Sequence, residues 1–219
     1  MGLIREVKRN NIGRVRELLD QGANPNFRDS FGTVLFEASH NDLTEMVRLL
    51  LDRGADPNIQ DRFGFTDLSD AVNHSRIKIV ELLLDRGADP NIKSGYGITA
   101  LMLASRHGNN EIVKLLLDNG ADPNIRDRDG KTALMIAEER GHNDVARLIR
   151  DHIRLQRARQ RARQRLAFAT RLLGNDDDLD YDVTARIAEY VNDLDQYGSG
   201  RSSSSRRRRK NYTRRRSFF

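Results

Sequence analysis

Residues 99–124 read Thr-Ala-Leu-Met-Leu-Ala-Ser-Arg-His-Gly-Asn-Asn-Glu-Ile-Val-Lys-Leu-Leu-Leu-Asp-Asn-Gly-Ala-Asp-Pro-Asn, and this stretch decides the fold. Its last five residues are one of four copies of a Gly-Ala-Asn/Asp-Pro-Asn string. The copies start at Gly22, Gly54, Gly87 and Gly120, so consecutive copies are 32, 33 and 33 residues apart. A constant period of this length indicates a repeat architecture, in which each unit buries its apolar face against its neighbours.

The residues that recur around each string are suited to ending one helix and starting the next. The Gly that opens the string favours the left-handed conformation that stops a helix, and the Pro three residues later prevents the helix from resuming. A second Gly follows seven residues after each Pro, and a Thr suited to capping a helix comes close behind it. These residues are Gly32, Gly64, Gly97 and Gly130, with Thr33, Thr66, Thr99 and Thr132. Apolar residues then recur at helical spacing, so each unit is predicted to be a turn, a helix, a short loop and a second helix.

This pattern resembles the ankyrin-repeat family, most closely over 99–104, at Gly108 and over 115–124. The resemblance covers about residues 3–152 and implies an all-α solenoid with β-hairpin turns. The five repeats are expected at about 1–26, 27–58, 59–91, 92–124 and 125–152. One family position departs from the consensus, because Phe36, Ser69, Met102 and Met135 replace its His. The hydrogen bonds that this His makes in the family are therefore expected to be missing.

The resemblance also implies where a partner binds, namely on the hairpin tips and on the inner face of the first helices. The tip residues at these positions are Phe31, Arg62, Phe63, Phe65, Tyr96, Ile98, Arg128 and Lys131, and the helix residues are His40, His74, Arg106 and His107. Phe31, Phe63 and Tyr96 share one position in successive repeats, which predicts a row of exposed rings. Aromatic and Arg side chains are enriched in interface hot spots. The alternative is that the rings only pack against neighbouring hairpins.

No metal, cofactor or catalytic centre is predicted. His40, His74 and His107 fall in successive repeats, which we expect to stack about 10 Å apart, whereas zinc holds its nitrogen ligands at about 2 Å. The chain lacks a phosphate-binding Gly-Lys-Ser/Thr loop, a His-Glu-x-x-His motif and a nucleophile elbow. The sequence therefore indicates a binding protein and not an enzyme.

The protein is expected to be a monomer, and its composition suits the inside of the cell, in the cytoplasm or the nucleus. There is no Cys, which excludes disulfides and zinc thiolate sites and suits a reducing compartment. No apolar run approaches the roughly 18 residues of a membrane span, and the first residues do not read as a secretory signal. The net charge of +6 is uneven: residues 1–152 carry 21 Lys and Arg against 24 Asp and Glu, and residues 153–219 carry 17 against 8. The basic character therefore belongs to the second region.

The first part of this region, 153–173, contains seven Arg and no acid. Leu155, Ala158, Ala162, Leu166, Ala169 and Leu173 follow one another at helical spacing, so we expect the segment to extend the second helix of the last repeat. One interpretation is a solvated extension that covers the apolar end of the solenoid. The other is an Arg-rich helix that binds RNA or an acidic protein.

The next part, 174–197, is acidic and contains a short amphipathic stretch from Leu179 to Val191. The stretch resembles the opening of an F-box, which ankyrin proteins of large DNA viruses often carry in truncated form at their ends. Asp180 stands where the F-box has Pro, and the match stops after about 15 residues. The resemblance implies contact with the adaptor subunit of a cullin-type ubiquitin ligase through Leu179, Val183, Ile187, Tyr190 and Val191. The alternative is a small helix that folds back on the basic helix or on the repeats.

The last part, 198–219, contains a Ser run and nine positive charges, a composition typical of disorder. Such runs serve as nuclear import signals or as nonspecific, salt-sensitive contacts to nucleic acid. The residues expected to act in this way are Arg206, Arg207, Arg208, Arg209 and Lys210. The sequence thus favours a protein-binding scaffold or adaptor, with a nucleic-acid-associated nuclear protein as the alternative.

Overall fold

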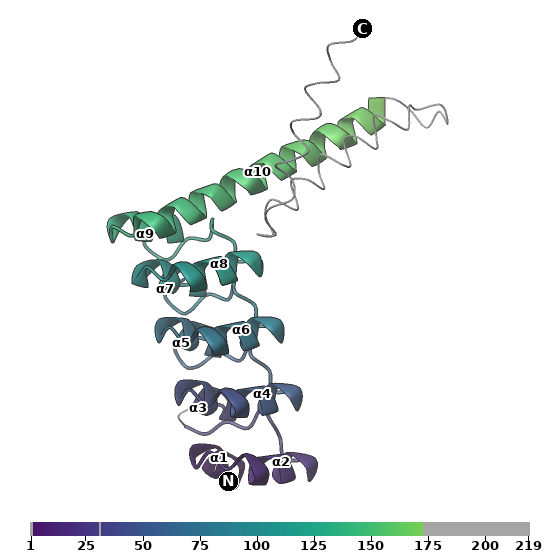
Figure 1. Cartoon of the computed structure of the whole chain (residues 1–219), viewed down its shortest axis with the longest axis vertical. Helices are drawn as coiled ribbons and strands as arrows, with labels where there is room; N and C mark the ends of the chain where they lie inside the picture. The colour runs from purple at the N-terminus through teal and green to yellow at the C-terminus, as the bar shows by residue number, and fades with distance from the viewer. Residues whose placement is uncertain (1, 31, 173–219) are drawn as a thin grey trace, which may run out of the picture. The chain divides into compact units, whose positions relative to one another are not determined.

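The computed structural model describes residues 2–30 and 32–172, and the regular secondary structure of this part of the chain is almost entirely helical (Figure 1). Its helices are α1 Gly2–Lys8, α2 Ile12–Asp20, α3 Val34–His40, α4 Thr44–Asp52, α5 Asp67–Asn73, α6 Ile77–Asp85, α7 Ala100–His107, α8 Asn110–Asp118, α9 Ala133–Glu139 and α10 Asn143–Leu172. The prediction of an all-α fold is confirmed. The chain divides into two compact units, Met1–Arg150 and Asp151–Phe219.

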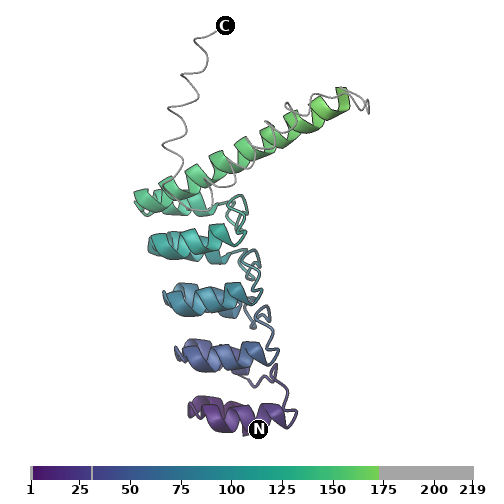
Figure 2. The same cartoon turned by 45° about the vertical axis from the view of Figure 1, so that its right-hand side comes forward.

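Within the first unit the helices form antiparallel pairs that stack as successive layers (Figure 2). The first helices pack on one another in the order α1, α3, α5, α7 and α9, and the second helices pack in the order α2, α4, α6 and α8. A loop leaves each second helix, turns, and enters the next first helix. This arrangement is a solenoid, as the period of the sequence predicts.

A Thr starts four of the first helices. The side chains of Thr33, Thr66, Thr99 and Thr132 accept hydrogen bonds from backbone N–H groups three residues on, at 2.9, 3.3, 3.4 and 3.3 Å. The N–H groups belong to the residues that replace the family's His. The Thr caps therefore persist without that His, and they satisfy one of the backbone donors that every helix start leaves unpaired.

The core is built from the same position in successive layers. Leu50, Leu83, Leu116 and Ile149 are each fully buried and lie 33 residues apart. Burial of one such side chain stabilises the fold by about 1.5–3 kcal/mol relative to exposure. Because no single helix pair has a second face to cover these side chains, stability comes from stacking neighbouring pairs.

Asparagine side chains link the loops of consecutive layers. Asn26, Asn58 and Asn91 close the Gly-Ala-Asn/Asp-Pro-Asn strings, and their Oδ1 atoms accept the backbone N–H of Asp56, Asp89 and Asp122 at 2.7, 2.8 and 2.7 Å. Their Nδ2 atoms donate to the carbonyls of Gly54, Gly87 and Gly120. Each asparagine therefore fixes the register of the next layer through two backbone groups.

The Arg-rich segment predicted at 153–173 is helical as far as Leu172, because α10 continues from Asn143 without a break. Within the second unit, Arg154 pairs with Asp151 at 3.5 Å. The acidic segment 174–197 and the Ser/Arg-rich tail 198–219 lie outside the described residues, as do Leu179, Val183, Ile187, Tyr190, Val191 and Arg206 to Lys210.

Candidate partner-binding surface

The tips of the loops are hairpin turns closed by backbone hydrogen bonds. Asp61 N–H donates to Phe65 O at 2.8 Å, Ser94 N–H to Ile98 O at 2.9 Å, and Asp127 N–H to Lys131 O at 3.0 Å. The arms are too short to form strands: over residues 2–30 and 32–172 the β-structure is a single isolated bridge between Arg28 and Thr33. The predicted β-hairpin turns are therefore present as turns without strands.

The side chain of the first residue in a tip also accepts hydrogen bonds from backbone N–H groups of the same tip. Asp61 Oδ1 accepts from the N–H groups of Phe63 and Phe65, both at 2.8 Å. Ser94 Oγ takes the same part in the next tip, where it accepts from the N–H groups of Tyr96 and Ile98 at 3.3 and 3.2 Å. These hydrogen bonds fix the conformation of the backbone that carries Phe63 and Tyr96.

Consecutive tips are bonded to each other. The Phe63 carbonyl accepts the Gly95 N–H at 2.7 Å, and the Tyr96 carbonyl accepts the Arg128 N–H at 3.2 Å. This close approach requires Gly64, which has a φ of +81° and whose added Cβ would lie 2.7 Å from the Gly95 nitrogen. The tips therefore form one continuous, hydrogen-bonded edge and not a set of independent loops.

Two aromatic side chains project from this edge. Phe63 is 49% exposed and Tyr96 is 54% exposed, and we call this pair the tip aromatics. The Arg62 guanidinium lies 4.8 Å from the Phe63 ring centroid, and the Arg128 guanidinium lies 5.9 Å from that of Tyr96. Each pair combines an aromatic face with a cation, which is the chemistry of a protein-binding hot spot. Phe31, the third predicted member of the row, lies outside the described residues.

The other predicted tip residues, Phe65, Ile98 and Lys131, are less accessible to a partner. Phe65 and Ile98 are half-buried beneath the turns. Lys131 Nζ donates to Glu139 Oε2 at 2.7 Å, and this hydrogen bond together with the carboxylate charge raises the pKa of Lys131. Of the predicted tip residues that the structure describes, the tip aromatics and their two arginines are the most accessible.

The four predicted helix residues lie at the carboxyl ends of α3, α5 and α7. His40, His74 and His107 are exposed, and Arg106 is half-buried. His107 Nε2 lies 3.1 Å from Asn73 Oδ1, and the Arg106 carbonyl accepts from His142 Nε2 at 3.1 Å. Both contacts cross from one helix pair to another, so these residues also connect layers.

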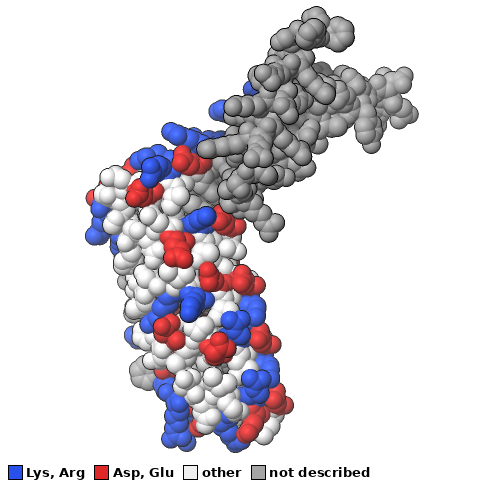
Figure 3. All heavy atoms as spheres, viewed as in Figure 1, with Lys and Arg blue, Asp and Glu red and all other residues white. Residues whose placement is uncertain are grey.

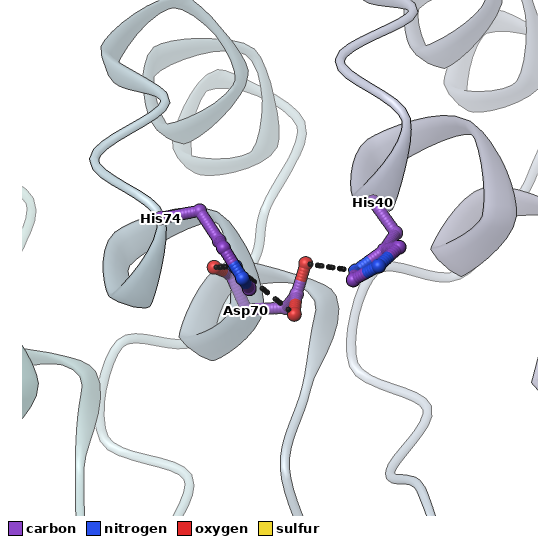
Figure 4. Close-up of side chains that lie close together, drawn as sticks. All are labelled: His40, Asp70 and His74. Atoms are coloured by element: carbon purple, nitrogen blue, oxygen red, sulfur yellow. Dashed lines mark hydrogen bonds and ion pairs between the residues drawn. The ribbon is translucent and has the colours of Figure 1, made fainter.

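The prediction that the stacking distance of the repeats, about 10 Å, keeps the histidines apart is wrong for His40 and His74. The His40 and His74 ring centroids lie 5.4 Å apart and the rings meet edge to face, so the layer spacing of about 10 Å does not separate them. Both rings turn toward the Asp70 carboxylate (Figure 4), with His40 Nδ1 3.4 Å from Oδ2 and His74 Nδ1 3.3 Å from Oδ1. The layer spacing separates helix axes, whereas side chains reach across it.

Asp70 was not predicted as a site residue. It lies on α5 four residues before His74, which places both on one helix face. Arg76 Nη1 donates to Asp70 Oδ2 at 3.2 Å and to the Ser39 carbonyl at 2.8 Å. The four-residue spacing of Asp70 and His74 is visible in the sequence, whereas the approach of His40, 34 residues before His74, depends on how far its side chain reaches into the next layer.

A second acid that the sequence did not reveal, Asp67, lies beneath the tips. It is 4% exposed, and burial, reinforced by the nearby charges of Asp70, Asp56 and Asp61, raises its pKa well above 3.8. Asp67 lines a cavity of about 10 Å³ beside Phe36 and Phe65. Such a volume is about that of one water molecule and is too small for an organic substrate.

Opposite charges alternate on the exposed face. Figure 3 shows Lys and Arg interspersed with Asp and Glu over the solenoid face in view, without a large patch of one sign. None of the helices described over 2–30 and 32–172 is both long and apolar enough to cross a membrane. A mixed surface with a few exposed rings fits a protein partner better than a polyanion.

The stacked helix pairs, capped turns and bonded tips define a helical repeat protein. A family model described as ankyrin repeats in three copies matches residues 3–94 and again 87–159. The chain therefore belongs to the ankyrin-repeat family, whose members are generally interaction modules and not enzymes. The search of curated proteins found no match to the chain.

Proposed function

We propose that this protein is an adaptor that captures a protein partner along the edge of its hairpin tips. The observation that carries the proposal is the half-exposure of the tip aromatics, each beside an arginine, on one bonded edge. Each of the five helix pairs is taken as one repeat, so the edge spans several repeats. An aromatic ring held at a fixed backbone binds with little further loss of conformational entropy.

The test is capture of partners from a eukaryotic lysate treated with nuclease. We expect Phe63→Ala combined with Tyr96→Ala to reduce recovery of the partners that wild-type protein enriches by about tenfold or more. Lys78→Ala on α6, also an exposed position, is the control and is expected to change nothing. Unchanged recovery with the double variant would show that the tip aromatics do not contact the partner.

In its most specific form, the adaptor is the substrate receptor of a cullin-type ubiquitin ligase. The support is the F-box-like sequence of 179–191, whose Val183, Ile187, Tyr190 and Val191 repeat at helical spacing. The adaptor and cullin subunits should be recovered with the full-length protein and lost when 174–197 is removed. If these subunits are never recovered, the F-box likeness has no function and capture by the tips stands alone.

The charge of the tail favours a second function, association with nucleic acid or import into the nucleus. Residues 198–219 carry nine positive charges and no acid. Binding through such a tail should weaken steeply as salt rises, since each contact to a phosphate releases a counterion. Deletion of 198–219 should abolish nucleic-acid binding and leave capture by the tips intact; nuclear exclusion of the deleted form would instead indicate an import signal.

A further inference from the structure

His40, Asp70 and His74, here called the imidazole cluster, bring together side chains that bind transition-metal ions. We propose that the cluster binds one Zn²⁺ ion, which joins the second and third helix pairs and keeps one coordination position open. His40 ends α3, and Asp70 and His74 lie at the end of α5. Imidazole and carboxylate are established ligand types for zinc. This proposal is independent of partner capture by the tips.

The separations between the groups fit the ion. One ligand atom from each of the three residues lies within 4.8 Å of the other two. Zinc bonds of about 2.0–2.1 Å in tetrahedral geometry place neighbouring ligand atoms about 3.3 Å apart. His40 Nδ1 lies 3.4 Å from Asp70 Oδ2 and His74 Nδ1 lies 3.3 Å from Asp70 Oδ1, so each imidazole is close to this separation from one oxygen of the carboxylate. A proton on either Nδ1 atom must leave before that nitrogen binds the ion, so zinc binding competes with protons.

The surroundings orient the rings and leave the cluster accessible. The Phe36 ring stacks on His40 with 5.4 Å between centroids and 18° between planes. The His40 and His74 side chains are 49% and 40% exposed, while Asp70 is only 15% exposed. The carboxylate is therefore held in place at the base, and the imidazoles can close on an ion from the solvent side. The solvent-exposed side of the cluster would leave the fourth position of a bound ion to water.

Two contacts at the imidazole cluster weaken the binding of Zn²⁺. Arg76 places a positive charge 3.2 Å from Asp70 Oδ2, and His74 Nδ1 gives up its 2.9 Å hydrogen bond to the Asp70 carbonyl when it ligates. With only three protein ligands and an adjacent guanidinium, the site binds zinc more weakly than a structural site with four protein ligands. The absence of Cys from the chain leaves zinc without a thiolate competitor within the protein.

The test is the thermal unfolding of the full-length protein with and without Zn²⁺. At a concentration about a hundred times the dissociation constant, binding to the folded state should raise the melting temperature by roughly 5 °C. Ca²⁺ and Mg²⁺, which prefer oxygen ligands, should give no shift. We expect the zinc shift to disappear in His40→Ala and in His74→Ala.

His107→Ala is the matched control, because His107 occupies the corresponding helix end one layer further on and contacts Asn73. It should keep the full zinc shift. The metal-free melting temperature of each variant shows whether that variant folds. Visible absorption of bound Co²⁺ gives a second readout on wild-type protein, since four-coordinate Co²⁺ absorbs strongly. Lack of a zinc shift in wild type, lack of this absorption, or a shift that survives in either His40→Ala or His74→Ala would overturn the proposal.

Discussion

Among individual residues, the asparagines that end the first three Gly-Ala-Asn/Asp-Pro-Asn strings stabilise the stack through hydrogen bonds between layers. Asn58 accepts the Asp89 N–H at 2.8 Å and donates to the Gly87 carbonyl at 3.2 Å, and so joins one layer to the next. Neither group belongs to the hydrogen-bonding ladder of a helix. Loss of the side chain removes the bonds that hold both backbone groups across the layer boundary.

We expect Asn58→Ala to lower the free energy of unfolding by about 1–3 kcal/mol, since it removes two hydrogen bonds that each contribute about 0.5–1.5 kcal/mol. Asn110→Ala is the control, because Asn110 is exposed at the start of α8. Urea unfolding measured by circular dichroism gives both values. Equal losses for the two variants would contradict the interlayer role of Asn58.

Asp67 is the residue that opposes stability. Its Oδ2 atom finds no hydrogen-bond partner among residues 2–30 and 32–172, and desolvation raises its pKa well above 3.8. The folded state therefore holds the Asp67 proton more tightly than the unfolded state does. This contribution favours folding below about pH 3.8 and is lost as pH rises toward the folded-state pKa.

Asp67→Ala should consequently stabilise the protein at pH 7, by about 1–2 kcal/mol on the usual cost of an unpaired buried polar group. Ala100 and Ala133 already occupy the corresponding positions of the next two layers, so Ala fits the site. The gain should shrink as the pH of the unfolding experiment is lowered toward 4. Glu81→Ala, at an exposed position of α6, should give no such gain. A loss of stability at pH 7 would show that the Asp67 carboxylate is stabilised by a contact that this account lacks.

Among the structural elements, the hairpin tips depend on close backbone contact. Gly64 combines a φ of +81° with an added Cβ that would lie 2.7 Å from the Gly95 nitrogen. Gly120 has a similar φ of +86°, but its added Cβ would have no heavy atom within 4 Å. Substituting Ala at each glycine therefore separates two free-energy costs. Gly120→Ala shows the cost of a left-handed backbone alone, and Gly64→Ala adds the cost of a steric clash between the Cβ and the neighbouring tip.

We expect Gly64→Ala to destabilise the fold by about 1–3 kcal/mol more than Gly120→Ala, which should show only the left-handed penalty of about 1–2 kcal/mol. Chemical denaturation measures the difference. Hydrogen exchange at the Gly95 amide, which donates to Phe63, should also accelerate in Gly64→Ala. Equal destabilisation by the two variants would mean that the tips are not tightly joined.

The elements were largely predictable from the sequence, because their signals are local. The Thr caps, the Gly stops and the apolar spacing recur within each unit and predicted the helix pairs. The imidazole cluster and the burial of Asp67 were not predictable in this way. They depend on how far a side chain such as His40 reaches into the next layer, which the repeat period does not specify. The tip aromatics were predicted from their shared position, and their exposure follows from the turns that carry them.

For the whole molecule, the linear stack determines how binding is distributed. Helices pack on those of the adjacent layer, so a surface change in one layer leaves distant layers unaffected. The tip aromatics belong to two successive layers and share one bonded edge, so a partner that contacts one ring is positioned to contact the other. We therefore expect the partner to lie along this edge.

Site-specific photocrosslinking locates the bound partner on the surface of the protein. A photoreactive phenylalanine analogue is placed at Phe63, at Tyr96 or at Lys78, and each form is irradiated in lysate with its captured partner. We predict that the partner crosslinks from positions 63 and 96, which lie on the tip edge, and not from position 78, which lies on α6. Crosslinking from position 78 without crosslinking from 63 or 96 would contradict the account and move the partner to the layer of second helices.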